Sequence, residues 1–117
     1  MVPPTNIAAA RLKQEFVKVS QSGTLGGAAV LASLASLALA CCSSSDDRIS
    51  TVAIALFGIC QGYSDARWQR PVDGEEQSKF FDCCSQPISD AVEFIQTGGS
   101  SEDATRIAAR LARVALC

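Results

Sequence analysis

The charge-free stretch between Lys18 and Asp46 is the feature that most constrains the fold of this chain. Inside it, residues 25–42 carry only two polar side chains, those of Ser33 and Ser36. A helix that is apolar around its whole circumference belongs in a protein core or in a lipid bilayer. Three interpretations of this segment therefore compete, and each places the rest of the chain in a different setting.

The first interpretation is a buried helix. Large apolar side chains in residues 25–42 recur at helical spacing, and small side chains recur every four residues on a second face, where a neighbouring helix could approach closely. The large residues are Val30, Leu34, Leu37 and Cys41, and the small ones are Ala28, Ala32, Ser36 and Ala40.

The second interpretation is a helical-hairpin membrane protein. Residues 25–42 reach the length of a bilayer span, and residues 49–63 could form the return limb. The basic residues outside the two limbs would place both termini in the cytoplasm. Two features weaken this interpretation, because the first limb is rich in alanine and the second is short for a bilayer.

The third interpretation is export. Residues 37–44, LALACCSS, resemble the signal of a bacterial lipoprotein, in which a small residue precedes a cysteine that becomes lipidated. The sequence departs from that pattern at Ala38, where leucine is favoured. The preceding segment is also long and contains Glu15, unlike a short basic leader. We favour the buried helix over the membrane hairpin, and the hairpin over export.

The rest of the chain also has helical periodicity. Apolar stripes with spacings of three and four occur in residues 8–19, 49–63, 88–95 and 107–114, and no long run alternates with period two. The segment from Ser85 to Pro87 predicts a break in the fourth helical piece. We therefore expect one all-α domain over residues 1–117, a compact bundle of about five helices. Residues 25–42 and 49–63 should form its central apolar hairpin.

Composition argues against several classes of function. The 117 residues contain no histidine, which removes Cys-His and Ser-His nucleophilic pairs and imidazole metal sites. The net charge of −2 gives no electrostatic reason to expect a nucleic-acid partner. No phosphate-binding glycine motif is present. We expect no enzymatic activity, no cofactor and no metal site.

Six cysteines raise the question of disulfides. They include two adjacent pairs, and neighbouring helical residues point about 100° apart, so they do not form a zinc or redox motif. We expect mostly reduced, structural thiols in a cytoplasmic protein. If bridges form, their most plausible members are Cys83, Cys84 and Cys117, which lie near expected helix ends.

Two groups of arginines are candidate partner-binding residues. Arg106, Arg110 and Arg113 form a basic ridge on the last expected helix, and their alternative role is to pair with the acidic region at residues 73–82. The second group is Arg67, Trp68 and Arg70, a composition that is enriched at protein interfaces. Equally well, Trp68 could close the bundle while the arginines extend outward.

These observations predict a small, non-catalytic interaction or assembly module that binds a protein partner or a second copy of itself. The mean hydropathy of +0.20 supports association, because it is high for a monomer of this size. A partner helix would dock on the small-residue face or at the edge formed by Arg67, Trp68 and Arg70.

Overall fold

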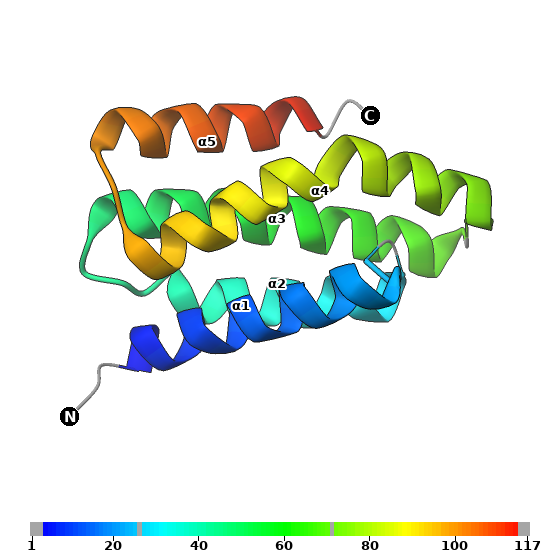
Figure 1. Cartoon of the computed structure of the whole chain (residues 1–117), viewed down its shortest axis with the longest axis horizontal. Coiled ribbons are helices and arrows are strands. Elements are labelled where there is room, and N and C mark those ends of the chain that lie inside the picture. Colours follow the sequence, from blue (N-terminus) through cyan, green and yellow to red (C-terminus); the bar gives the residue numbers. More distant parts are fainter. Residues whose placement is uncertain (1–3, 26, 71, 115–117) are drawn as a thin grey trace.

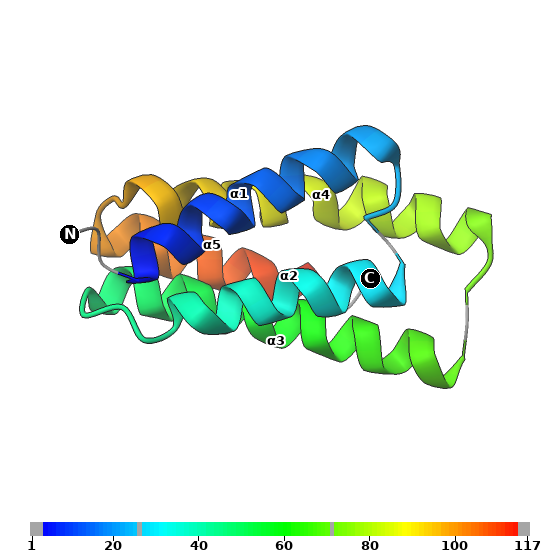
Figure 2. The same ribbon diagram turned by 90° about the horizontal axis from the view of Figure 1, so that it is seen from below.

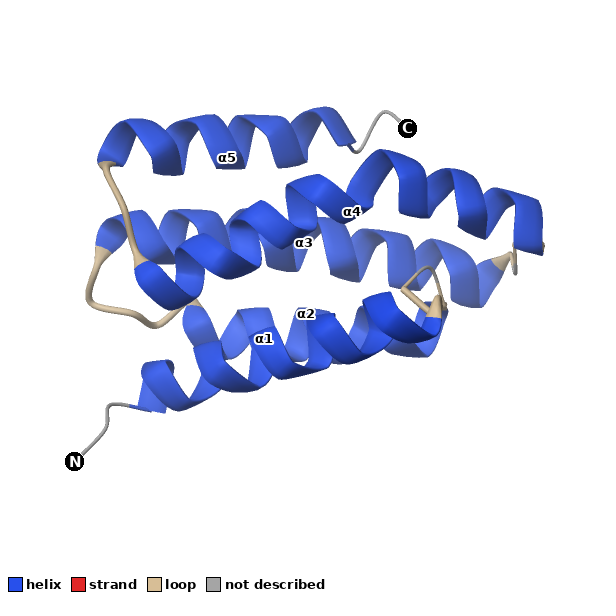
Figure 3. Cartoon of the chain, viewed as in Figure 1, coloured by secondary structure: helices blue, strands red, loops and turns tan. Residues whose placement is uncertain are grey.

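Five helices make up the computed structural model of the chain, which describes residues 4–25, 27–70 and 72–114. In chain order they are α1 (Pro4–Ser22), α2 (Ala28–Cys41), α3 (Asp47–Gln69), α4 (Gly74–Thr97) and α5 (Ser101–Val114). The described residues contain no strand (Figure 3). The prediction of an all-α bundle is confirmed.

Helices α1 to α4 form a closed ring of neighbours: α1 packs on α2, α2 on α3, α3 on α4, and α4 on α1. Helix α5 packs against both α3 and α4 (Figures 1 and 2). Helix α3 therefore has three neighbours, and its longest contact is with α2. Helix α4 also has three neighbours, and α2 and α3, which form the predicted apolar hairpin, share the most extensive helix–helix contact.

The buried side of most helices matches the predicted stripes. In α1 the stripe consists of Ala8, Leu12, Phe16 and Val19, and all four are buried. The same holds for the stripes of α4 and α5, which include Ile88, Val92, Ile95, Ile107, Leu111 and Val114. These side chains form one hydrophobic core together with residues of α2 and α3.

Helix α2 is turned relative to the prediction. Leu34 and Cys41 are buried as expected, but Val30 and Leu37 are only half-buried. Leu31, Ala35 and Ala38 take the inner positions instead. Periodicity does not select a face in a helix that is apolar all round, so packing against α1 and α3 decides it. The predicted small-residue face is half-buried at Ala28 and Ala32 and exposed at Ser36 and Ala40.

The predicted break at Ser85 to Pro87 is wrong, because α4 continues through Pro87. An internal proline removes one helical hydrogen bond and costs about 3 kcal/mol. Pro87 is buried among the apolar residues of α4, and the burial of that face offsets the cost.

Polar side chains cap the first turns of α3, α4 and α5. The side chain of Asp46 accepts a hydrogen bond from the backbone N–H of Arg48 at 3.0 Å, and that of Asp73 accepts one from Glu76 at 2.8 Å. The side-chain oxygen of Ser100 accepts a hydrogen bond from the backbone N–H of Asp103 at 3.1 Å at the start of α5.

Helix α2 has 14 residues, fewer than the 18 that the membrane interpretation needs. Among the described residues, no helix combines the length and the apolar character that crossing a bilayer requires.

Candidate functional site

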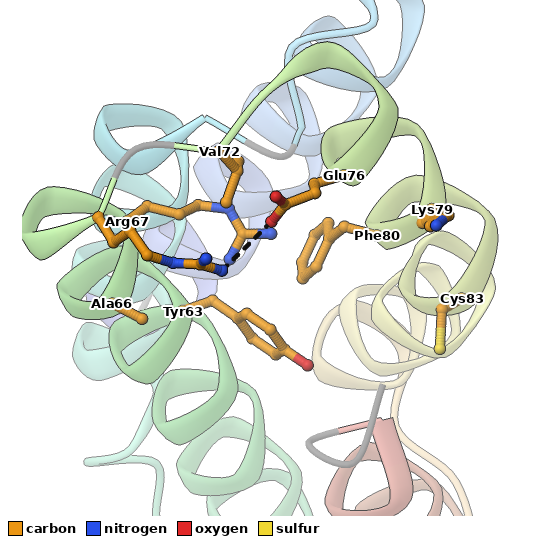
Figure 4. Close-up of a pocket in the computed structure, with 9 residues that line it drawn as sticks. Tyr63, Ala66, Arg67, Val72, Glu76, Lys79, Phe80 and Cys83 are labelled. Atoms are coloured by element: carbon orange, nitrogen blue, oxygen red, sulfur yellow. Dashed lines mark hydrogen bonds and ion pairs between the residues drawn. The ribbon is translucent and has the colours of Figure 1, made fainter.

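The main cavity lies where the end of α3 meets the first turns of α4, and it has a volume of about 440 Å³ (Figure 4). Its size falls within the range of small-ligand sites. Tyr63, Ala66, Arg67 and Arg70 line it from α3, Glu76, Lys79, Phe80 and Cys83 line it from α4, and Val72 lines it from the connection between them.

Arg67 is the unusual residue of this cavity, because its side chain turns inward and is only 8% exposed. Its guanidinium carbon lies 5.0 Å from the ring centroid of Tyr63 and 4.6 Å from that of Phe80. The two rings meet edge to face with centroids 4.8 Å apart. Two cation–π contacts therefore replace part of the water that Arg67 loses on folding.

Hydrogen bonding does not complete the environment of Arg67. Its Nε is fully covered and has no hydrogen-bond partner, and the guanidinium donates to none of the described residues. Burial is the main influence on the pKa of Arg67 and lowers it, whereas nearby Tyr63, Cys84 and Glu76 act in the opposite direction. A buried cation without a hydrogen-bonded anion costs several kcal/mol.

The acidic side chain of this cavity is engaged by another arginine. Glu76 Oε2 lies 3.5 Å from Nη2 of Arg70, a long and exposed contact, as the dashed line in Figure 4 indicates. Lys79 lies at the rim and pairs with Glu75 at 3.6 Å. Of the described residues, three cations and one carboxylate thus line the cavity, and their summed side-chain charge is positive.

The surroundings hold the aromatic walls in place. The hydroxyl of Tyr63 donates to the backbone carbonyl of Val114 in α5 at 2.9 Å, which fixes the ring from outside the cavity. Phe80 is buried in the core between α3 and α4. The N-cap residue of α4, Asp73, follows the last residue of α3 by four positions. This short connection keeps the two helix ends close.

A shallower depression of about 230 Å³ follows the exposed side of α3 and shares Tyr63 and Ala66 with the main cavity. Gly58 and Gly62 form its floor, one turn apart. Ile54, one turn before Gly58, is 58% exposed. We call the row Ile54, Gly58, Gly62 and Ala66 the α3 face.

The predicted group Arg67, Trp68 and Arg70 is divided by the structure. Arg67 faces the interior, while Trp68 is 67% exposed and Arg70 is exposed at the cavity edge. The alternative in which Trp68 closes the bundle and the arginines extend outward is wrong for Arg67 and Trp68. Arg67 is adjacent to the aromatic pair on α3 and α4, so burying it forms two cation–π contacts.

The arginines of α5 lie on its exposed side. Arg106 pairs with Asp103 at 3.2 Å, Arg110 pairs with Asp90 of α4 at 2.9 Å, and Arg113 is exposed. The pairs seen therefore involve Asp103 and Asp90 instead of the expected acidic region at residues 73–82. Exposed pairs of this kind contribute at most about 1 kcal/mol each.

Four cysteines are free thiols: Cys41, Cys60 and Cys84 are buried and Cys42 is half-buried. Burial raises the pKa of Cys41 and of Cys84 to about 11 and that of Cys60 to about 12. A buried thiol with a raised pKa is a poor nucleophile. Cys83 is disulfide-bonded, and Cys117, its predicted partner, lies outside the described residues, so that pairing stays a prediction. Cys84 is a buried free thiol, not a bridge.

Sequence reasoning missed Tyr63 and Phe80 as partners of Arg67, and it missed the α3 face. One signal was present: Tyr63 and Arg67 are spaced by four, which places an aromatic ring and a guanidinium on one side of a helix. The spacing of Gly58, Gly62 and Ala66 was a second signal. No protein-family model, curated protein or solved structure matches the chain.

Proposed function

We propose that this protein is a non-catalytic assembly module that pairs with a second copy of itself through the α3 face. The observation that carries the proposal is the presence of two glycines in the middle of α3 that its own fold does not require. Glycine in a helix interior costs about 0.5–1 kcal/mol relative to alanine.

Neither glycine has a reason to be there within one copy of the chain. A Cβ atom built on Gly58 or Gly62 would have nothing within 4 Å, and neither residue has a positive φ. Small residues one turn apart are what allows a second helix to approach closely. A contact between chains therefore supplies a role for residues that otherwise weaken α3.

The α3 face is self-complementary. In an antiparallel pair of α3 helices that cross between Gly58 and Gly62, Ile54 of each copy lies opposite Ala66 of the other. Rows of residues spaced by four interdigitate in the commonest class of helix packing. The exposed side chain of Ile54 would then enter the depression beside Ala66, and the twofold symmetry would repeat this contact.

Charge also favours pairing of like chains. Between Arg48 and Asp65, α3 carries no charged side chain, so two copies would meet without repulsion. The non-catalytic part of the proposal is supported by the buried free thiols, whose raised pKa values disfavour nucleophilic chemistry.

Sedimentation equilibrium over a concentration series tests this proposal with three proteins. We expect the wild-type chain to form dimers and the variant Gly62→Leu to remain monomeric, because the larger side chain fills the depression. The control Ala109→Leu adds the same side chain at an exposed position of α5 and should dimerise like the wild type. A wild-type chain that stays monomeric, or a Gly62→Leu variant that dimerises equally well, contradicts the proposal.

A further inference from the structure

We propose that the cavity around Arg67 is a binding site for an organic carboxylate, a molecule with one carboxylate group on an apolar body. The proposal goes beyond assembly through the α3 face and does not depend on it. It rests on a cavity of about 440 Å³ that contains a buried, incompletely satisfied guanidinium.

The guanidinium of Arg67 lacks a hydrogen-bonded anion among the described residues. Arg67 is more than nine-tenths buried, its Nε has no partner, and its guanidinium donates no hydrogen bond to the described residues. The two rings beside it, Tyr63 and Phe80, contact the cation through their π-systems and accept no conventional hydrogen bond. A carboxylate in the cavity would supply the planar pair of acceptors that a guanidinium binds best.

The side chains that line the cavity carry a surplus of positive charge. Among the described residues, Arg67, Arg70 and Lys79 line the cavity with one carboxylate, that of Glu76, which pairs with Arg70 at 3.5 Å. Figure 4 shows the carboxylate of Glu76 pointing toward the arginine side chains and away from Lys79. A ligand with a single negative charge therefore enters a site with a positive surplus, and a cationic ligand would be repelled.

Apolar side chains form part of the cavity wall. Ala66, Val72 and Phe80 line the same cavity as the cations, so a ligand that fills it also buries hydrocarbon surface. Inorganic phosphate would leave that surface uncovered and would lose its own strong hydration. These walls favour a carboxylate with an aromatic or aliphatic body over a small hydrated anion.

Glu76 is the internal rival of such a ligand, because rotation of its side chain would bring a carboxylate closer to Arg67. The two possibilities differ in the response to Glu76→Gln. If a ligand is the partner of Arg67, removing the competing charge strengthens carboxylate binding. If Glu76 itself is the partner, the substitution also lowers the stability of the free protein.

Titration calorimetry with phenylacetate, hexanoate, inorganic phosphate and the neutral analogue phenylacetamide tests the proposal. We expect saturable binding of phenylacetate and hexanoate, and at least tenfold weaker binding of phenylacetamide and phosphate. Because Trp68 is adjacent to Arg67 in α3, its fluorescence provides a second readout. Absence of saturable carboxylate binding, or equal binding of the neutral analogue, overturns the proposal.

Three variants locate the site. Arg67→Met should lower phenylacetate affinity at least tenfold, and Glu76→Gln should raise it several-fold. Arg106→Met, which removes an exposed arginine of α5, should leave it unchanged. Unfolding of Arg67→Met by heat serves as a folding control, and Glu76→Gln tests the site separately if Arg67→Met does not fold. Unchanged affinity in both site variants overturns the proposal. Sedimentation of the same samples shows whether dimerisation fails independently.

Discussion

The two ends of α3 differ in the kind of side chain that they bury. Near its start, Val52, Ala53 and Leu56 are fully buried in the hydrophobic core that α3 shares with α2. Near its end, the same helix buries Arg67 beside a cavity. The first end is completed by the chain's own helices, whereas at the second no described residue is hydrogen-bonded to the guanidinium of Arg67.

This difference indicates which end carries stability and which is available for binding. Full burial of a leucine or valine side chain contributes about 1.5–3 kcal/mol. A buried cation costs several kcal/mol unless an anion and hydrogen bonds compensate it, and cation–π contacts return only about 2 kcal/mol each when desolvated. The apolar end can therefore support the fold while the charged end remains incomplete.

The largest expected effect distinguishes the apolar end from its exposed surroundings. Replacing Leu56 by alanine should lower the free energy of unfolding by about 2–5 kcal/mol, because it leaves a cavity in a fully buried site. Leu39→Ala, at a position that is 54% exposed, should change it by less than about 0.5 kcal/mol. Urea unfolding followed by circular dichroism measures both. Similar losses in the two variants would contradict the assignment of the core.

Alkaline pH should weaken the same contacts through the buried thiols. The pKa values of Cys41, Cys60 and Cys84 are raised above 9.0 in the folded protein, so the native state retains protons that the unfolded chain loses. Stability should therefore be constant below about pH 9 and fall as the pH rises toward 11, by up to about 1.4 kcal/mol per pH unit for each thiol.

The control for this effect is Cys60→Ala, which removes one thiol. Its stability should decline less steeply above about pH 9 than that of the wild type, after normalisation to neutral pH. Tyr63 adds a decline in the same direction, because burial raises its pKa too. Equal slopes for Cys60→Ala and the wild type would argue that Cys60 is accessible to water.

A smaller effect is expected at the hydrogen bond that joins the two halves of the hairpin. The buried hydroxyl of Ser64 donates to the carbonyl of Ala28 at 2.8 Å. Ser64→Ala should lower stability by about 1 kcal/mol. Thr105→Ala removes an exposed bond to Ser101 and should have an effect below about 0.5 kcal/mol. If Ser64→Ala is as mild as the control in urea unfolding, the bond contributes little to the contact of α2 with α3.

The smallest expected effect has the opposite sign. Gly62→Ala should stabilise the monomer by about 0.5–1 kcal/mol, because the added methyl group meets no atom within 4 Å. At Gly99 the same change should destabilise, since its Cβ would lie 2.6 Å from the ring of Phe94. Thermal unfolding under dilute, monomeric conditions measures both. Destabilisation by Gly62→Ala would show that the glycine serves the monomer itself.

Much of the fold was predictable because three of the five helices, α1, α4 and α5, are amphipathic. The spacing of Leu12, Phe16 and Val19, for example, defines a single apolar side that must face the core. In α2 this signal is lost, and Leu31 rather than Val30 is buried. The continuity of α4 through Pro87 was not predictable either, because the compensation comes from tertiary burial rather than from local preference.

The candidate site was predictable only in part. The sequence places Arg67, Trp68 and Arg70 together, but charge and size favour an exposed arginine and a buried tryptophan, and the structure has the reverse. The inward orientation of the Arg67 side chain depends on its contact with Phe80, a residue of α4. Contacts between residues that are distant in the chain leave no periodic signal, so spacing alone does not reveal such a cavity.

The most direct test of this account is the free energy of unfolding of Arg67→Met compared with the wild type, without added carboxylate. If Arg67 is a buried cation that the chain leaves incomplete, an apolar side chain of similar length should be neutral or should stabilise the protein by about 1 kcal/mol. A loss of about 3–5 kcal/mol, the cost of breaking a satisfied buried pair, would show that Arg67 already has its partner and would contradict the account.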